Sequence, residues 1–305
     1  MKNRIRNLFK LKPIYGYHNT KIGYICLAPF LILFFTFTIL PVIISIFLSV
    51  TDYDMFNIPK FVGFENFKTL FLEDDIFLIA LKNTMVFAVL SGPTSYILSF
   101  VMAWLICRFR KFKNFFSLAF YAPSICSGIA LSTIWLYFFS SDSYGFINQF
   151  LLNLGAISSP ILWVTNPKYI LGVVIFISIW MGMGTTFLTF IAGFQGLSEE
   201  ISEAAKLDGI KYASQELIYI ILPQMKPQLL FGAITSITGA FGVFDIAVSV
   251  AGLPSVEYSA HTMVCHIYDY AFIRFEIGYS SAVAVILFLI SFTTGKIVRK
   301  ALASD

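Results

Sequence analysis

Apolar residues run along this chain in stretches far longer than those of soluble proteins. A helix that crosses the hydrocarbon core of a membrane needs about 20 mainly apolar residues, because it rises roughly 1.5 Å per residue across some 30 Å. Such stretches predict six membrane-spanning helices, over residues 22–50, 84–106, 115–139, 169–193, 229–251 and 277–298. The pattern therefore predicts an all-α integral membrane protein.

A further apolar run, residues 150–163, is too short to cross a membrane. Gly155 and Pro160 interrupt it. We expect an interfacial or partly buried helix here, in the loop between the third and fourth predicted spans.

The composition agrees with a lipid environment. Of the 305 residues, 58% are apolar and 12% are charged, whereas soluble domains hold about 45–50% apolar and about 25% charged residues. The four cysteines are scattered, mostly in apolar runs, so no disulfide framework is expected. The sequence is therefore not that of a disordered, fibrous or ordinary cytosolic protein.

Basic residues cluster at the ends of alternate spans. Residues 1–21 carry lysines and arginines but no acidic residue, and further basic clusters follow the second and sixth spans. Because Lys and Arg favour the cytoplasmic side, we expect a basic cytoplasmic N-terminus at 1–21, a transmembrane domain at 22–298 and a cytoplasmic C-terminus at 299–305. These clusters account for the net charge of +4, so no nucleic-acid partner is expected.

The loop between the fourth and fifth predicted spans, residues 194–228, is polar and much longer than a connector needs. Ser198 is a suitable N-cap for a helix predicted over residues 199–207, whose first turns are rich in glutamate. Gly209 then permits a left-handed turn, and a second helix is predicted over residues 212–222, ending at a proline. An ordered loop of this length indicates a docking surface; the alternative is a simple connector.

Motifs within and outside this loop occur in a recognisable order. The loop holds Glu203, Ala204, Ala205, Asp208, Gly209, Ile220, Leu222 and Pro223; the rest of the chain holds SVTDYD at 49–54, FVGFENF at 61–67 and GYSSA at 278–282. Together they resemble the membrane subunits of binding-protein-dependent ABC importers, in the branch that carries maltose and glycerol-3-phosphate. The loop resembles the EAA motif of that family, with one extra residue between the glycine and the proline, which we place near Ala213 and Ser214.

This resemblance implies an importer permease fold of six helices, whose cytoplasmic EAA loop is a coupling helix that docks on a separate ATP-hydrolysing subunit. The residues implied in that docking are Glu203, Ala204, Ala205, Asp208, Gly209 and Pro223. The resemblance also implies a bacterial plasma membrane, a heterodimer with a second homologous permease, two ATP-binding subunits and an extracytoplasmic sugar-binding protein. The chain lacks a GxxxxGK loop followed by Ser or Thr, so ATP and Mg would be bound by the partner and no cofactor is expected in this chain.

Small and polar residues follow helical spacing in two predicted spans. Ser178, Gly182 and Thr185 share one face of the fourth span, and Thr238, Gly242 and Asp245 share one face of the fifth. Such faces at membrane depth could line a path for a hydroxylated solute, or they could pack helices. With the positions that the resemblance adds, the predicted substrate pathway is Ser178, Trp180, Gly182, Thr185, Ser236, Thr238, Gly242 and Asp245.

The sequence lacks a catalytic constellation of nucleophile, base and acid. His261, Cys265 and His266 are spaced like metal ligands, but no fourth ligand follows at a suitable interval, so no metal site is expected. Together with the resemblance, this predicts a permease subunit of an ATP-driven sugar importer and not an enzyme. Two alternatives are an ion-coupled secondary transporter, for which Asp245 is the candidate ion site, and a membrane anchor that transports nothing.

Overall fold

The computed structural model describes residues 20–108 and 113–303, in two units that divide after Phe47. In the first unit, α2 (Thr20–Phe34) continues through the π turn η2 (Phe35–Ile39) into α3 (Leu40–Leu48), whose last residue belongs to the second unit. Pro41 has no amide hydrogen and crowds the carbonyl four residues before it. The wider π turn precedes this proline, and the Leu40 amide donates to the Phe35 carbonyl five residues back. The predicted basic segment, residues 1–21, lies almost entirely outside the described residues.

The second unit is a helical bundle with one short hairpin. Strands β1 (Thr51–Asp52) and β2 (Lys60–Phe61) are antiparallel, with Thr51 opposite Phe61. The helices are α4 (Glu65–Leu72), α5 (Asp75–Arg108), α6 (Lys113–Ile125), α7 (Gly128–Phe138), α8 (Phe146–Asn153), α9 (Pro167–Gly182), α10 (Gly184–Gln195), α11 (Glu199–Leu207), α12 (Ala213–Glu216), η3 (Leu217–Ile221), α13 (Leu222–Gln224), α14 (Lys226–Ala240), α15 (Asp245–Ala251), η4 (Val256–Tyr258), α16 (Met263–Tyr268), η5 (Asp269–Ile273) and α17 (Ile277–Ala303).

Four helical stretches in the described part of the chain are long and apolar enough to cross a membrane: Tyr24–Leu48, Asp75–Arg108, Pro167–Gln195 and Ile277–Leu302. Two bent pairs raise the number to six if each pair forms one span. One pair joins α6 to α7 at an angle of 101°, and the other joins residues 213–224 to α14 at 81°. The mostly helical membrane fold predicted from the sequence is confirmed.

The expectation of an unbroken fifth span over residues 229–251 is wrong. Helix α14 ends at Ala240 and α15 begins at Asp245. Short-range hydrogen bonds close the end of α14, from the Phe241 amide to Thr238 and from the Gly242 amide to Gly239. Glycine is a poor helix former, and a carboxylate favours a helix start, so the local sequence explains both the end and the new beginning.

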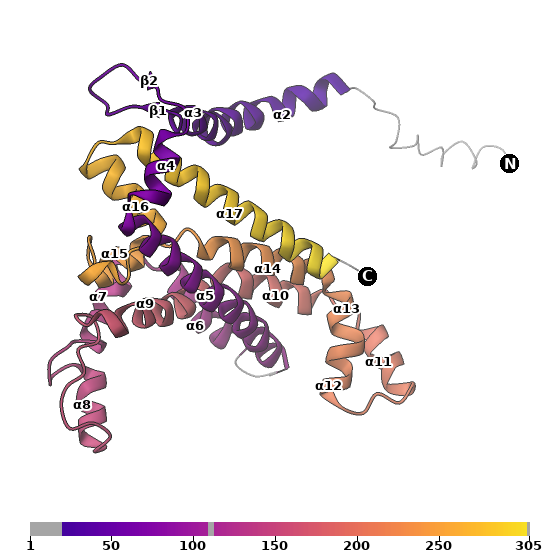
Figure 1. Ribbon diagram of the computed structural model, residues 1–305. Helices are drawn as coiled ribbons and strands as arrows, with labels where there is room; N and C mark the ends of the chain where they lie inside the picture. The colour runs from indigo at the N-terminus through magenta and orange to yellow at the C-terminus, as the bar shows by residue number, and fades with distance from the viewer. Residues whose placement is uncertain (1–19, 109–112, 304–305) are drawn as a thin grey trace. The chain divides into compact units, whose positions relative to one another are not determined.

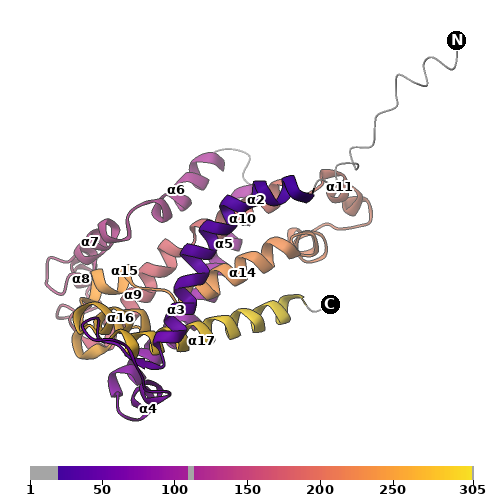
Figure 2. The same cartoon turned by 90° about the horizontal axis from the view of Figure 1, so that it is seen from above.

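Helix α5 is the centre of the second unit and packs against α9, α10 and α14 (Figures 1 and 2). Its buried face combines Phe87 with small polar residues such as Ser91, Ser95 and Ser99. At Gly92 the backbone of α14 approaches closely, because an added Cβ would lie 3.0 Å from the Cα of Ile237. Small residues that let helix backbones approach are typical of membrane helix packing.

The expected helix over residues 150–163 is shorter and begins earlier than predicted. Helix α8 covers Phe146–Asn153, and Gly155 then takes a left-handed conformation with φ of 69°. The following chain folds back on α8 through the buried Asn148, whose side-chain oxygen accepts from the Ile161 amide and from the Trp163 indole. A buried asparagine with four hydrogen-bonding positions thus replaces helical hydrogen bonds in this loop.

Candidate functional site

A cavity of about 620 Å³ lies where three helix breaks meet in the second unit. The breaks separate α6 from α7, α9 from α10, and α14 from α15. Its volume lies within the roughly 300–1,000 Å³ that small-molecule sites occupy. Its polar lining comes from six helices and consists of Ser91, Ser95, Ser124, Ser178, Thr185, Thr186, Thr235, Ser236 and Asp245.

Six of the eight residues predicted for the substrate pathway line this cavity: Ser178, Gly182, Thr185, Ser236, Gly242 and Asp245. Trp180 and Thr238 lie elsewhere. The Trp180 ring packs edge-on against Trp135, with ring centres 5.4 Å apart, and Thr238 lines a separate groove between α14 and α17. Residues two positions apart point to different sides of a helix, so Trp180 cannot share a face with Ser178, nor Thr238 with Ser236.

The break between α14 and α15 changes how Asp245 reaches the cavity. The predicted face joined Thr238, Gly242 and Asp245 through continuous helical spacing, and that spacing ends at Ala240. Asp245 instead stands in the first turn of α15, and its Cβ would lie 3.6 Å from a Cβ added at Gly128 at the start of α7. Two helix starts, one of them carrying a carboxylate, therefore meet at the cavity wall.

Two buried hydroxyl groups in the cavity wall have no hydrogen-bond partner among the described residues. They belong to Ser91 on α5 and Ser178 on α9. A buried hydroxyl without a partner costs on the order of 1–3 kcal/mol, so both groups are available to a bound molecule or to water. By contrast, Thr186 on α10 contacts Ser236 on α14 at 2.8 Å and holds these helices together beside the cavity.

Sequence reasoning missed the contributions of α5 and α6. Ser91 and Ser95 are four residues apart on the buried face of α5, next to Gly92. That spacing is the same signal that identified the face of the fourth span. Ser124 and Cys126 reach the cavity only because the chain turns sharply between α6 and α7, and no spacing rule predicts that position.

The helix predicted over residues 199–207 is present as α11, over Glu199–Leu207. Gly209 follows it in a left-handed conformation with φ of 98°, as predicted. Ala205 is buried, whereas Glu203, Ala204 and Asp208 are exposed. Leu207 is 90% exposed, so the described part of the chain leaves an apolar side chain beside these polar residues uncovered.

The second helix of this loop extends beyond its predicted end at Leu222. It begins with α12, widens into the π turn η3 and continues as α13 through Pro223 to Gln224. In the π turn the Leu222 amide binds the Leu217 carbonyl, five residues back instead of four. The π turn thus holds one residue more than an α-helical turn, within the stretch between Gly209 and Pro223.

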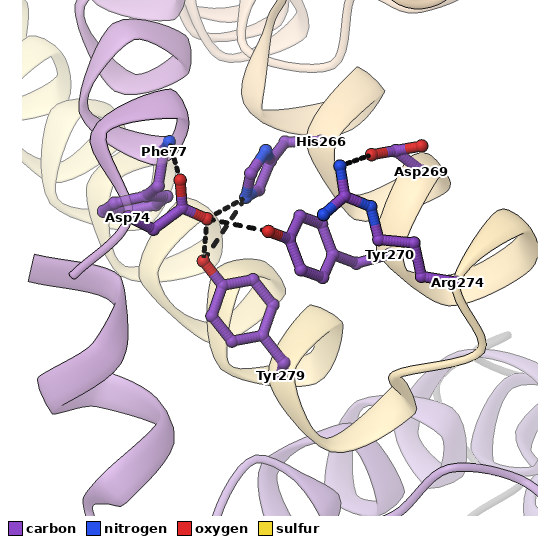
Figure 3. A network of polar contacts seen from close by, with 7 residues as sticks. All are labelled: Asp74, Phe77, His266, Asp269, Tyr270, Arg274 and Tyr279. Carbon is purple, nitrogen blue, oxygen red and sulfur yellow. Dashed lines mark hydrogen bonds and ion pairs between the residues drawn. The ribbon is translucent and has the colours of Figure 1, made fainter.

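A network of polar side chains joins α16, η5 and α17 to the start of α5 (Figure 3). One carboxylate oxygen of Asp74 accepts hydrogen bonds from the Tyr279 and Tyr270 hydroxyls, the latter at 3.1 Å, and lies 3.3 Å from the Nε2 atom of His266. The other oxygen accepts from the Phe77 amide at 2.9 Å and so caps α5. We call Asp74, His266, Tyr270 and Tyr279 the Asp74 network.

Burial and hydrogen bonding act in opposite directions on the pKa of Asp74. Desolvation raises it, but the hydrogen bonds from Tyr279 and Phe77 and the nearby His266 outweigh that effect and hold the pKa below its usual value. Burial lowers the pKa of the neighbouring His261 to about 4, helped by His266. Both ring nitrogens of His261 are buried without a partner among the described residues, so this histidine is neutral at pH 7.

Two of the residues with metal-like spacing have other contacts. The Cys265 thiol lies 3.2 Å from the Thr262 hydroxyl, and burial raises its pKa. His266 faces Asp74, and its ring centre lies 5.6 Å from that of His261, with the two rings nearly perpendicular. His266 thus links α16 to the start of α5, and Cys265 contacts Thr262, the residue that caps α16.

Comparison with known proteins decides the family. Residues 95–304 match the family described as the inner membrane component of binding-protein-dependent transport systems. The chain belongs to this family. It is 32% identical to the "Probable ABC transporter permease protein YesP" of Bacillus subtilis, over 88% of this chain and 86% of that protein. It is 30% identical to the lactose transport system permease protein LacF of Rhizobium radiobacter, over 86% of this chain and 87% of LacF.

The fold agrees with a solved importer. A chain of a bacterial alginate ABC transporter, crystallised with a periplasmic protein that binds alginate pentasaccharide, superposes with a TM-score of 0.77 at 20% identity, over 91% of this chain and 92% of the other. The permease fold inferred from the motifs is therefore confirmed. These similarities favour an ABC permease over the ion-coupled transporter and the inert anchor.

Proposed function

We propose that this chain is one permease subunit of an ATP-driven importer and that a neutral carbohydrate passes through the 620 Å³ cavity. The observation that carries this proposal is the pair of buried, unpartnered hydroxyls of Ser91 and Ser178 in a cavity that also holds the Asp245 carboxylate. A sugar hydroxyl both donates and accepts hydrogen bonds, so it complements all three groups.

The charge of the lining supports a neutral cargo over an anionic one. Among the described residues, Asp245 is the charged group of the cavity wall, and neither Lys nor Arg contributes to it. An anion at membrane depth would need a positive partner. The lactose named for the relative from Rhizobium radiobacter supports a carbohydrate as the class of substrate.

The exposed face of α11 supports docking on a separate ATPase subunit. Glu203, Ala204 and Leu207 are exposed. The small side chain of Ala204 would let the backbone of a partner approach closely, and the apolar side chain of Leu207 would be buried by the contact. A carboxylate at the same place would pair with a basic group of the partner and fix the register. ATP and Mg would then be bound by that partner, and closure of its two copies would move α11.

The remaining assembly follows the same proposal. A second, homologous permease completes the pathway, and an extracytoplasmic sugar-binding protein delivers the cargo to a bacterial plasma membrane. The basic residues before the first span and at the end of α17 support cytoplasmic termini.

Uptake by the reconstituted importer tests the cavity. The cargo is first identified by measuring which of a panel of disaccharides and glycerol 3-phosphate binds the cognate binding protein. Asp245→Ala removes hydrogen bonds of a charged group, each worth about 1.5–3 kcal/mol, so KM for uptake should rise about tenfold to a hundredfold. Gly182→Trp should block uptake by filling the cavity.

Thr238→Ala is the matched control, because the sequence predicts Thr238 equally but the structure places it outside the cavity. It should leave KM unchanged. If Asp245→Ala and Thr238→Ala changed KM equally, the cavity assignment would be contradicted. It would also be contradicted if both Asp245→Ala and Gly182→Trp left uptake unchanged.

A further inference from the structure

A second groove lies on the surface of the bundle, between α14 and α17. Its volume is about 360 Å³, and its lining includes Ile234 and Thr238 on α14 and Phe288, Phe292, Lys296 and Arg299 on α17. Gly295 creates the close approach of the two helices, because an added Cβ would lie 3.2 Å from the methyl carbon of Thr238. The groove is distinct from the proposed substrate cavity.

The groove has an apolar half and a basic half. The Phe288 and Phe292 rings are stacked 5.8 Å apart and each is about half exposed. Lys296 and Arg299 are exposed and stand three residues apart, so they share one side of α17 near its end. The Lys296 ammonium lies 4.4 Å from the centre of the Phe292 ring, so its side chain leans toward the apolar half.

The two cations have no counter-charge in the described part of the chain. Neither α14 nor α17 contains an Asp or a Glu, and no described carboxylate pairs with Lys296 or Arg299. The first acidic residue of the sequence is Asp52, so the first apolar helix cannot supply one either. A cation within a membrane span needs an anionic partner or access to the headgroup region.

We propose that this groove binds an anionic phospholipid. The phosphate lies between Lys296 and Arg299, where it receives charge-assisted hydrogen bonds, and an acyl chain lies along Phe288 and Phe292. Basic pockets between membrane helices near the interface are suited to lipid phosphates. The proposal requires only that α17 spans the membrane, and it does not depend on the cargo of the importer.

The test compares lipid retention in the complete, purified importer. The complex is equilibrated in nanodiscs of equal parts phosphatidylglycerol and phosphatidylcholine with matched acyl chains, extracted, and the lipids that remain bound are counted by native mass spectrometry. Wild-type complex should retain phosphatidylglycerol preferentially. In the double variant Lys296→Gln with Arg299→Gln, the ratio of retained phosphatidylglycerol to phosphatidylcholine should fall by roughly thirtyfold. Each basic residue at a membrane surface contributes about 1 kcal/mol to the binding of an anionic lipid, and two are removed.

Lys300→Gln removes a neighbouring charge outside the groove and should retain the wild-type preference. Equal retention of both lipids by the wild type, or an equal loss in Lys300→Gln, would overturn the proposal. Soluble glycerol phosphate should not displace the lipid; displacement at millimolar concentration would instead indicate a site for a soluble phosphate. Both variants must assemble with their partners, which the same spectra report.

A photoreactive benzoylphenylalanine at Phe288 identifies the occupant directly. Lipid adducts support the proposal. Adducts with another subunit, or with the first apolar helix of this chain, would show that protein covers the groove and would overturn it.

Discussion

Asp74→Ala tests how much the Asp74 network contributes to the packing of α16 against α5. The substitution removes the acceptor for the Tyr270 and Tyr279 hydroxyls and for His266, and it removes the cap on the Phe77 amide. The Asp74 side chain is 8% exposed and that of His266 is fully buried, so water cannot readily replace the lost partner. Each buried donor left without its partner costs about 1–3 kcal/mol, so the loss of this shared acceptor should cost about 3–5 kcal/mol in total.

This loss should appear as local opening, because the network is one of the links between α16 and α5, beside the hydrogen bond from the Met263 amide to the Thr84 hydroxyl. A change of about 3–5 kcal/mol corresponds to an increase of about a hundredfold to a few thousandfold in the population of the open state. Hydrogen exchange of the purified complex, followed by mass spectrometry of peptides from residues 263–273, measures it. The amides of α16 and η5 should exchange faster by that factor, whereas those of α10 should not change.

Asp54→Ala is the matched control. Asp54 is also an acidic residue before α5, but among the described residues it accepts hydrogen bonds only within its own turn, from Asn57 and the Phe56 amide. It should leave exchange in α16 unchanged. If Asp74→Ala changed that exchange no more than Asp54→Ala does, the Asp74 network would not hold α16 in place.

Three further predictions follow from the same end of the molecule and from the loop of α11. His261 has a pKa of about 4 in the folded state and about 6.5 in the unfolded state, so below pH 6.5 the unfolded state binds the extra proton. The free energy of unfolding is therefore highest above pH 6.5 and should fall by about 2 kcal/mol at pH 5. Thermal unfolding at pH 7 and at pH 5 should detect this loss, and the loss should be smaller in His261→Gln. Burial also lowers the pKa of His266, although Asp74 and Asp269 oppose this effect. His266 should therefore cause part of the loss of stability at pH 5 to remain in the His261→Gln variant. Gly278→Ala places a Cβ on the Thr51 carbonyl oxygen, so it should destabilise the junction of β1 and α17 by at least about 1–3 kcal/mol. The unfolding temperature should be lower in this variant. Gly172→Ala, where the added Cβ meets no atom within 4 Å, is the control and should leave the unfolding temperature unchanged. Glu203→Lys should abolish cargo-stimulated ATP hydrolysis by the assembled importer while the chain still inserts, and wild-type stimulation in that variant would contradict the docking role of α11.

The sequence predicted the mostly helical membrane fold and the approximate positions of the four long spans, because long apolar runs have no other common explanation in a chain with so few charges. It also predicted α11 and the turn at Gly209, since a cap, an acidic first turn and a glycine act locally. It could not predict the end of α14 at Ala240. Residues 229–251 remain apolar through the break, and hydropathy alone does not distinguish a kinked helix from an interrupted one.

The cavity was predictable only in part for the same reason. Ser178, Gly182 and Thr185 lie within helical structure on either side of one short break, so spacing identified their common face. Asp245 reaches the cavity from a separate helix, and Cys126 from the turn between α6 and α7. Tertiary packing set those positions. The position of the π turn at 217–221 was equally unpredictable, because a single added residue can be accommodated at several places in a helix.

Chemical modification of Cys126 tests the central claim, that the cavity is the pathway of an ATP-driven importer. Cys126 is exposed and lines the cavity, whereas Cys265 is buried and neither Cys26 nor Cys107 lines it. A bulky maleimide should abolish ATP-driven uptake by the reconstituted wild-type importer and leave the Cys126→Ser importer active. Full uptake after complete labelling of Cys126, or equal inhibition of both importers, would contradict the account.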